Sequence, residues 1–135
     1  MASWLVPTLA YVVLVGAAGV TTKVALRTIS WEQLVLWVPI VYVVIAAVLV
    51  ATRGARLPLG VGGAWAAVTA ICMALALIVL FYALTQEDAS RVVPASSAYP
   101  AVTLIGAALF LSESITLTRV LGTALVIAGV VLISR

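Results

Sequence analysis

The sequence predicts an all-α integral membrane protein, with five transmembrane helices joined by short loops. Of its 135 residues, 66% are hydrophobic and only 8% are charged, whereas soluble proteins carry about 25% charged residues. A water-soluble domain of this length could not bury so much apolar surface. We therefore expect a multi-pass protein of the cell membrane, and more specifically of a prokaryotic plasma membrane.

Five apolar segments are each long enough to cross a hydrocarbon core of about 30 Å, which takes roughly 20 residues. In order, the predicted helices cover residues 4–26, 31–52, 63–84, 92–111 and 117–134. The first segment lacks the basic flank of a cleavable signal peptide. Because the connections are short, we expect residues 1–135 to form a single transmembrane domain.

The first three helices have recognisable ends. Trp4 opens the first helix, as tryptophan often does at a membrane interface. Ser30 followed by Gln33 predicts a capping box at the start of the second. Pro58 and Gly60 break the chain before the third.

The fourth and fifth helices are marked by charges, prolines and a threonine. Glu87 and Arg91 are four residues apart and can pair on a helical turn. Pro94 lies near the start of the fourth helix, where it disturbs little, but Pro100 removes a backbone hydrogen bond and predicts a bend. Lipid tolerates this only where protein or water satisfies the freed groups. Thr116 can cap the fifth helix.

The distribution of basic residues between the two sides of the membrane is almost even. The side of the N-terminus has three: Arg53, Arg56 and Arg119. The opposite side has four: Lys23, Arg27, Arg91 and Arg135. Since Lys/Arg asymmetry sets orientation, either another feature fixes one orientation, or copies insert both ways and pair antiparallel, as the inverted repeats of transporters do.

Several motifs resemble one EamA-type domain of the drug/metabolite transporter superfamily, over essentially the whole chain. "GAAGVTTK" places Gly16 and Lys23 seven residues apart, and "FYAL" contains Tyr82. The most recognisable signature is a ladder of four residues: Pro100, Glu113, Gly122 and Gly129. The chain departs from the family pattern at Val15, often a tryptophan, and around Trp37, where many members carry an arginine.

The resemblance implies a half-transporter, since most members hold two such domains in one polypeptide. We expect a secondary transporter, an exporter or exchanger, for a small polar or amphipathic metabolite. It would work by alternating access as an antiparallel homodimer of ten helices. The alternatives are one subunit of a heteromeric transporter, and a non-transporting membrane scaffold or assembly protein.

Hydroxyl side chains on the fourth helix are the best candidates for lining a substrate pathway. Ser96, Tyr99, Pro100 and Thr103 follow i, i+3, i+4, i+7 spacing and would share one face of a continuous helix. Such hydroxyls can bind a polar substrate, bond carbonyls freed by the prolines, or join helices.

Three further residues are candidate substrate contacts. Lys23 lies about one turn inside the first span, where its ammonium can attract an anionic substrate or snorkel to the headgroups. Tyr11 lies on a polar stripe of the same helix. Tyr82 either faces a cavity or points to the interface.

Glu113 and three glycines are predicted to be structural. Glu113 can accept hydrogen bonds from the N-terminal amides of the fifth helix; a proton-coupling role is the alternative. Gly16 permits close approach of another helix, and Gly122 and Gly129 share a face of the fifth. That face would form a subunit interface or pack within its own subunit.

The composition argues against catalytic chemistry. The chain has no histidine and a single cysteine, Cys72, and no nucleotide-binding motif. We therefore expect no metal, no cofactor and no enzymatic activity, and no nucleic-acid partner. The expected partners are the lipid bilayer, a second copy or homologous subunit, and a small-molecule substrate.

Overall fold

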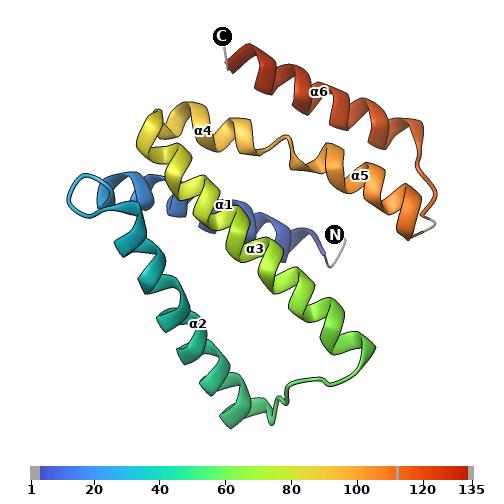
Figure 1. Ribbon diagram of the computed structural model, residues 1–135. Coiled ribbons are helices and arrows are strands. Elements are labelled where there is room, and N and C mark those ends of the chain that lie inside the picture. The colour runs from blue at the N-terminus through green and yellow to red at the C-terminus, as the bar shows by residue number, and fades with distance from the viewer. Residues whose placement is uncertain (1–3, 112, 134–135) are drawn as a thin grey trace. The chain divides into compact units, whose positions relative to one another are not determined.

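The computed structural model describes residues 4–111 and 113–133, and the described chain is helical (Figure 1). The helices are α1 (Leu5–Ala25), α2 (Trp31–Arg53), α3 (Val61–Gln86), α4 (Ala89–Ser96), α5 (Tyr99–Phe110) and α6 (Leu117–Ile133). Four segments are long and apolar enough to cross a membrane, α4 and α5 together counting as one of them; α6, of 17 residues, is a shorter apolar helix. The predicted all-helical, multi-pass membrane protein is confirmed. Ser134, the predicted end of the last helix, lies outside the described residues.

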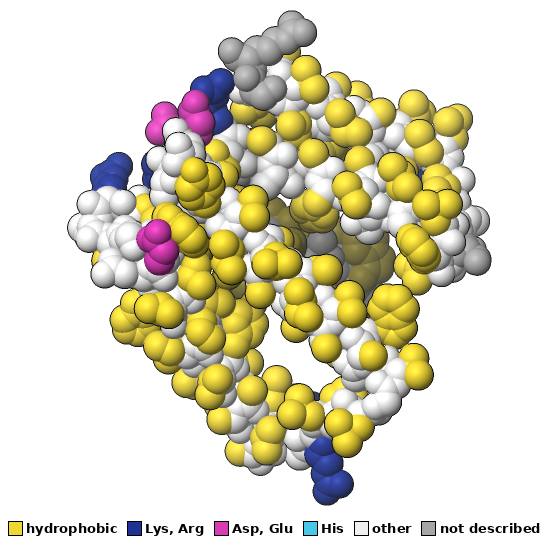
Figure 2. All heavy atoms as spheres, viewed as in Figure 1, with side chains coloured by type: hydrophobic (Ala, Val, Ile, Leu, Met, Phe, Trp, Pro, Cys, Tyr) yellow, Lys and Arg dark blue, Asp and Glu magenta, His cyan; other side chains and the backbone are white. Residues whose placement is uncertain are grey.

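Hydrophobic side chains face outward on these helices (Figure 2). Among the described residues, Phe81 and Leu84 are the buried large hydrophobic side chains. In water this arrangement would be unstable, because apolar surface is driven out of contact with water. Lipid is therefore the solvent for which these helices are built.

The chain divides into two compact units, one of residues 20–86 and the other of the remaining residues on either side. In the first unit, α2 and α3 pack together as a hairpin. The predicted capping box is confirmed: the Gln33 amide donates to the Ser30 hydroxyl, and the Ser30 amide donates to the Gln33 side chain. At its other end α2 stops at Gly54, whose left-handed φ of 61° suits glycine.

In the second unit, α6 packs against both α4 and α5. Thr116 caps α6 as predicted, its hydroxyl accepting a hydrogen bond from the Arg119 amide at 3.4 Å. Glu87 and Arg91 form the predicted ion pair, at 3.2 Å, at the start of α4.

The helix predicted over residues 92–111 is two helices rather than one bent helix. α4 ends at Ser96 and α5 begins at Tyr99, near the middle of the 22-residue span (Figure 1). Pro100 has no N–H to donate to the Ser96 carbonyl. The Ser97 amide donates to the Pro94 carbonyl at 3.0 Å, rather than to the Val93 carbonyl as in a continuous α-helix. The Ser96 hydroxyl donates to the carbonyl of Val93 at 2.7 Å. Pro100 thus removes the bond to the Ser96 carbonyl, and the Ser96 hydroxyl bonds the Val93 carbonyl that the Ser97 amide has left, so the helix ends here.

Candidate functional site

A groove of about 550 Å³ runs between α5 and α6 in the second unit. Its lining combines apolar residues with hydroxyls and two charges. The lining residues are Tyr99, Pro100, Thr103, Leu104, Ala107, Glu113, Arg119, Gly122, Thr123 and Val126. We call it the α5/α6 groove.

One end of the α5/α6 groove is charged, because Glu113 and Arg119 lie at the loop that joins the two helices. The Arg119 guanidinium donates one hydrogen bond, from Nη1 to the Ser114 carbonyl at 3.1 Å. This bond anchors the side chain to the loop. A guanidinium has five N–H donors, so Arg119 retains donors for an anion while it holds this bond.

The other end of the groove lies at the break between α4 and α5, where the hydroxyls are already partnered within the protein. Thr103 Oγ1 donates to the Tyr99 carbonyl at 3.3 Å. The Tyr99 hydroxyl interacts with the hydroxyl of Tyr11 on α1. The wall between the two ends is formed mainly by the apolar residues Leu104, Ala107 and Val126.

The predicted face of Ser96, Tyr99, Pro100 and Thr103 is divided by the break in the helix. Tyr99, Pro100 and Thr103 line the α5/α6 groove, whereas Ser96 belongs to α4 and its hydroxyl bonds the Val93 carbonyl. Pro94 lies within α4 without ending it. The spacing argument assumed one continuous helix, which is why it joined Ser96 to the other three.

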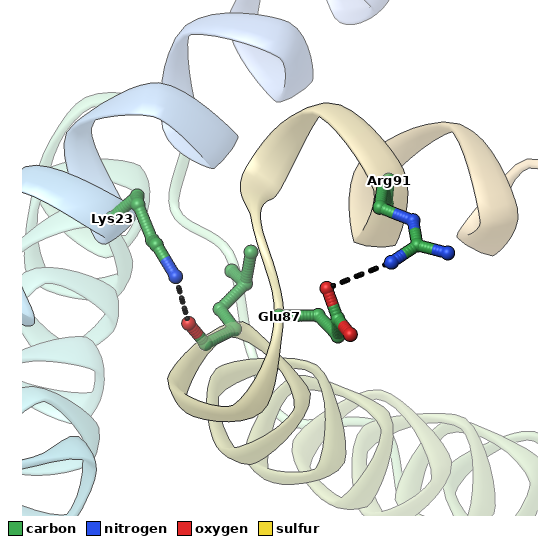
Figure 3. Close-up of polar contacts among 4 residues, drawn as sticks. Lys23, Glu87 and Arg91 are labelled. Atoms are coloured by element: carbon green, nitrogen blue, oxygen red, sulfur yellow. Dashed lines mark hydrogen bonds and ion pairs between the residues drawn. The ribbon is translucent and has the colours of Figure 1, made fainter. Parts of the chain in front are cut away.

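Lys23 stabilises the end of another helix. Its Nζ is part-buried and donates to the Leu84 carbonyl at 2.8 Å (Figure 3). Leu84 lies in the last turn of α3, where carbonyls lack an intrahelical partner and the helix dipole favours a cation. This structural role was not among the expectations from the sequence; contact with a substrate stays a prediction.

Tyr82 packs against an aromatic side chain at the start of α2. Its ring meets the ring of Trp31 edge to face, with centroids 6.1 Å apart and planes at 81°. Trp31 is the first residue of α2, so the ring pair lies at the start of that helix; contact of Tyr82 with a substrate stays a prediction.

The glycines differ in the space around them. A Cβ added to Gly19 would lie 2.7 Å from Val93 Cγ2, so here α1 and α4 approach closely. A Cβ at Gly16, Gly122 or Gly129 would meet nothing within 4 Å. Those three positions are open to lipid or to another protein surface.

Sequence reasoning overlooked the contribution of α6 to the groove. Arg119, Gly122, Thr123 and Val126 follow i, i+3, i+4, i+7 spacing, so the stripe was visible in the sequence. It was missed because Arg119 was counted only for membrane orientation. Within the described ranges, no group of three or more His, Cys, Asp or Glu side chains could hold a metal ion.

Apolar helices long enough to span a membrane define a multi-pass membrane protein. The chain matches the model of the EamA-like transporter family over residues 2–135, and it belongs to that family. The predicted family is thereby confirmed, and the family is one of transporters.

One relative is the uncharacterized protein MJ1333.1 of Methanocaldococcus jannaschii, which is 40% identical to the chain over 70 residues. The match spans about half of each protein, 52% of this chain and 51% of the relative. No solved structure matches the chain.

Proposed function

We propose that the protein is a secondary transporter in which two antiparallel copies carry a small polar or amphipathic metabolite by alternating access. Export or exchange is the direction we favour. Membership of the EamA-like transporter family supports the transport function. The interrupted span supports a pathway through the α4–α5 region.

The single observation that carries this proposal is the break between α4 and α5. It lies near the middle of a membrane span, where irregular backbone is stable only if it faces protein or a water-filled cavity. Substrate sites of secondary transporters lie near the midplane, at discontinuous helices. Tyr11 and Tyr99 present hydroxyls beside this break, so we assign them the first contacts with the substrate.

Two features support a pair of copies. The balance of basic residues, three against four, gives little bias to one orientation. Gly122 and Gly129 on α6 leave room for a second protein surface.

Orientation is tested with paired reporters at the C-terminus, one active only inside and one only outside the membrane. Antiparallel pairing requires activity of both. Two lysines added to the α2–α3 loop should shift the population to one orientation and abolish transport by the homodimer. Reporter activity on one side alone would exclude the homodimer and leave the heteromer.

The substrate class is found by thermal-shift screening of the purified protein against amino acids, sugar phosphates and organic cations. Uptake into proteoliposomes is then compared for Tyr11→Phe and Tyr99→Phe. Loss of one hydroxyl contact with the substrate should reduce its affinity about tenfold. Tyr42→Phe, an exposed tyrosine on α2, is the matched control. No uptake of any class would favour the scaffold alternative.

A further inference from the structure

The α5/α6 groove has the shape and chemistry of an amphiphile. One end carries a carboxylate and a guanidinium, at Glu113 and Arg119, and the wall beyond is formed mainly by apolar side chains such as Leu104, Ala107 and Val126. At the far end the Thr103 hydroxyl already donates to the Tyr99 carbonyl, so this hydroxyl does not require a polar occupant.

The groove also has the depth of one membrane leaflet. Its charged end lies at the loop between two spans, which places it at the membrane interface. Its far end lies at the break near the middle of the span Ala89–Phe110. The 12 residues of α5 rise about 18 Å at 1.5 Å each, and half of a hydrocarbon core is about 15 Å.

We infer that the α5/α6 groove is a binding site for a single membrane phospholipid with an amino headgroup. Arg119 binds the phosphate, because a guanidinium matches phosphate oxygens with several parallel donors. Glu113 binds the ammonium group of the same headgroup. An acyl chain lies along Leu104, Ala107 and Val126 as far as Tyr99.

Charge complementarity selects this occupant over the alternatives. A hydrocarbon alone would leave Arg119 and Glu113 without ligands, and a free phosphate compound would leave the apolar wall empty. A headgroup with one phosphate and one ammonium group pairs both charges and supplies the chain that the wall accommodates. Basic positions between transmembrane helices are recognised sites for lipid headgroups. This lipid site goes beyond the proposed transport and does not depend on it.

The test compares glycines that share one helix. Gly122 lines the groove, and a side chain there would enter open space; Gly129, two turns further along α6, is equally open but is not part of the groove wall. Gly122→Leu should fill the part of the groove that holds the acyl chain, whereas Gly129→Leu should leave that space open. Both replacements gain similar helix propensity, so folding effects cancel in the comparison.

The measurement is native mass spectrometry of protein released from detergent after incubation with phosphatidylethanolamine, phosphatidylglycerol or the soluble headgroup phosphoethanolamine. We expect one retained phosphatidylethanolamine per chain. Retention should be at least about tenfold lower in Arg119→Gln, because a charge-assisted bond is lost. Retention should fall as much in Gly122→Leu, because the leucine occupies the space of the acyl chain. Glu113→Gln should remove the preference for phosphatidylethanolamine over phosphatidylglycerol. Arg56→Gln, in the α2–α3 loop, should match the unmodified protein.

Equal retention by Gly122→Leu and Gly129→Leu would overturn the proposal, since the chain would then bind elsewhere. Binding of phosphoethanolamine as strong as binding of the lipid would also overturn it, because the site would recognise a soluble headgroup compound. A change of oligomeric state in Gly122→Leu without loss of lipid would identify a second copy as the occupant. Arg119→Lys keeps the charge and should recover part of the retention, which separates lipid binding from support of the loop.

Discussion

Pro39 in α2 and Pro100 at the start of α5 show how one residue type gives two different outcomes in a membrane span. α2 continues through Pro39 from Trp31 to Arg53 without interruption, whereas the span that contains Pro100 is divided into two helices. The difference lies in the neighbours. Leu36, Trp37 and Val38 precede Pro39 and offer no side-chain hydrogen bond to the backbone.

Pro100 follows Ser96 and Ser97, and both hydroxyls reach the Val93 carbonyl, at 2.7 Å and 3.5 Å. The hydroxyls therefore bond the Val93 carbonyl in place of the Ser97 amide, which donates to the Pro94 carbonyl. In lipid, where an unsatisfied backbone group costs several kcal/mol, that alternative decides whether a helix bends or ends. Pro39 does not interrupt its span, whereas Pro100, which follows Ser96 and Ser97, lies at an interruption.

The largest effect is expected on hydrogen exchange when Pro100 is replaced, with replacement of Pro39 as the comparison. Pro100→Ala restores an N–H for the Ser96 carbonyl, and an interior proline costs a helix about 3 kcal/mol, so hydrogen exchange over residues 97–102 should slow at least about tenfold. Pro39→Ala should change exchange in α2 far less, because that helix is already continuous. Exchange is followed by mass spectrometry in detergent. Equal slowing in both variants would refute the role given to the serines.

The next effect concerns how the α4 region packs. Gly19→Ala places a methyl group 2.7 Å from Val93 Cγ2 and should lower the free energy of unfolding by about 1–3 kcal/mol. Gly16→Ala, which meets nothing within 4 Å, should raise it by up to about 1 kcal/mol through helix propensity. Unfolding in mixed micelles measures both. Adding Val93→Ala to Gly19→Ala should recover stability; if it does not, the contact is not the cause.

A smaller effect on the free energy of unfolding is expected from Lys23, in the unit of residues 20–86. Lys23→Met removes the bond to the Leu84 carbonyl and should cost about 1–2 kcal/mol, less than a fully buried charged bond because the lysine is only part-buried. Arg27→Met, in the turn after α1, is the control and should cost less than about 0.5 kcal/mol. Unfolding in micelles again gives the values. If Lys23→Met leaves stability unchanged but weakens binding of anionic substrates, the substrate contact predicted from the sequence is supported instead.

The smallest effect compares two hydroxyls that bond backbone carbonyls. Ser96→Ala removes a bond at the interruption, and Thr69→Val removes a comparable bond to the Trp65 carbonyl within α3. Loss of the Ser96 bond should cost about 0.6 kcal/mol, while loss of the Thr69 bond should be close to neutral. Exchange of residues 94–98 should rise only in Ser96→Ala. A larger response in α3 would contradict the view that serine matters most where the helix ends.

The sequence predicted the spans well because hydrophobic length and capping act locally. The capping box at Ser30, the cap at Thr116 and the ion pair of Glu87 with Arg91 each depend on residues within one turn. The break at Pro100 was predicted only as a bend, since the hydroxyls were considered as partners of freed carbonyls and not as groups that end the helix.

The tertiary features were beyond the sequence because they need helices that are far apart in the chain. Lys23 meets Leu84 across 61 residues, and no local pattern marks a carbonyl as the partner of a distant lysine. The α5/α6 groove likewise depends on how two helices pack. Its residues could be proposed from α6 periodicity, but the pairing with α5 could not.

The interrupted span has a consequence for biosynthesis. Of the four long spans, Ala89–Phe110 has the lowest mean hydropathy, and it leaves the ribosome before α6, the helix with which it packs. While α6 is still being translated, this segment is held in the bilayer less firmly than α2 or α3. Its placement in the bilayer therefore depends on packing with α6 more than the placement of α2 or α3 does.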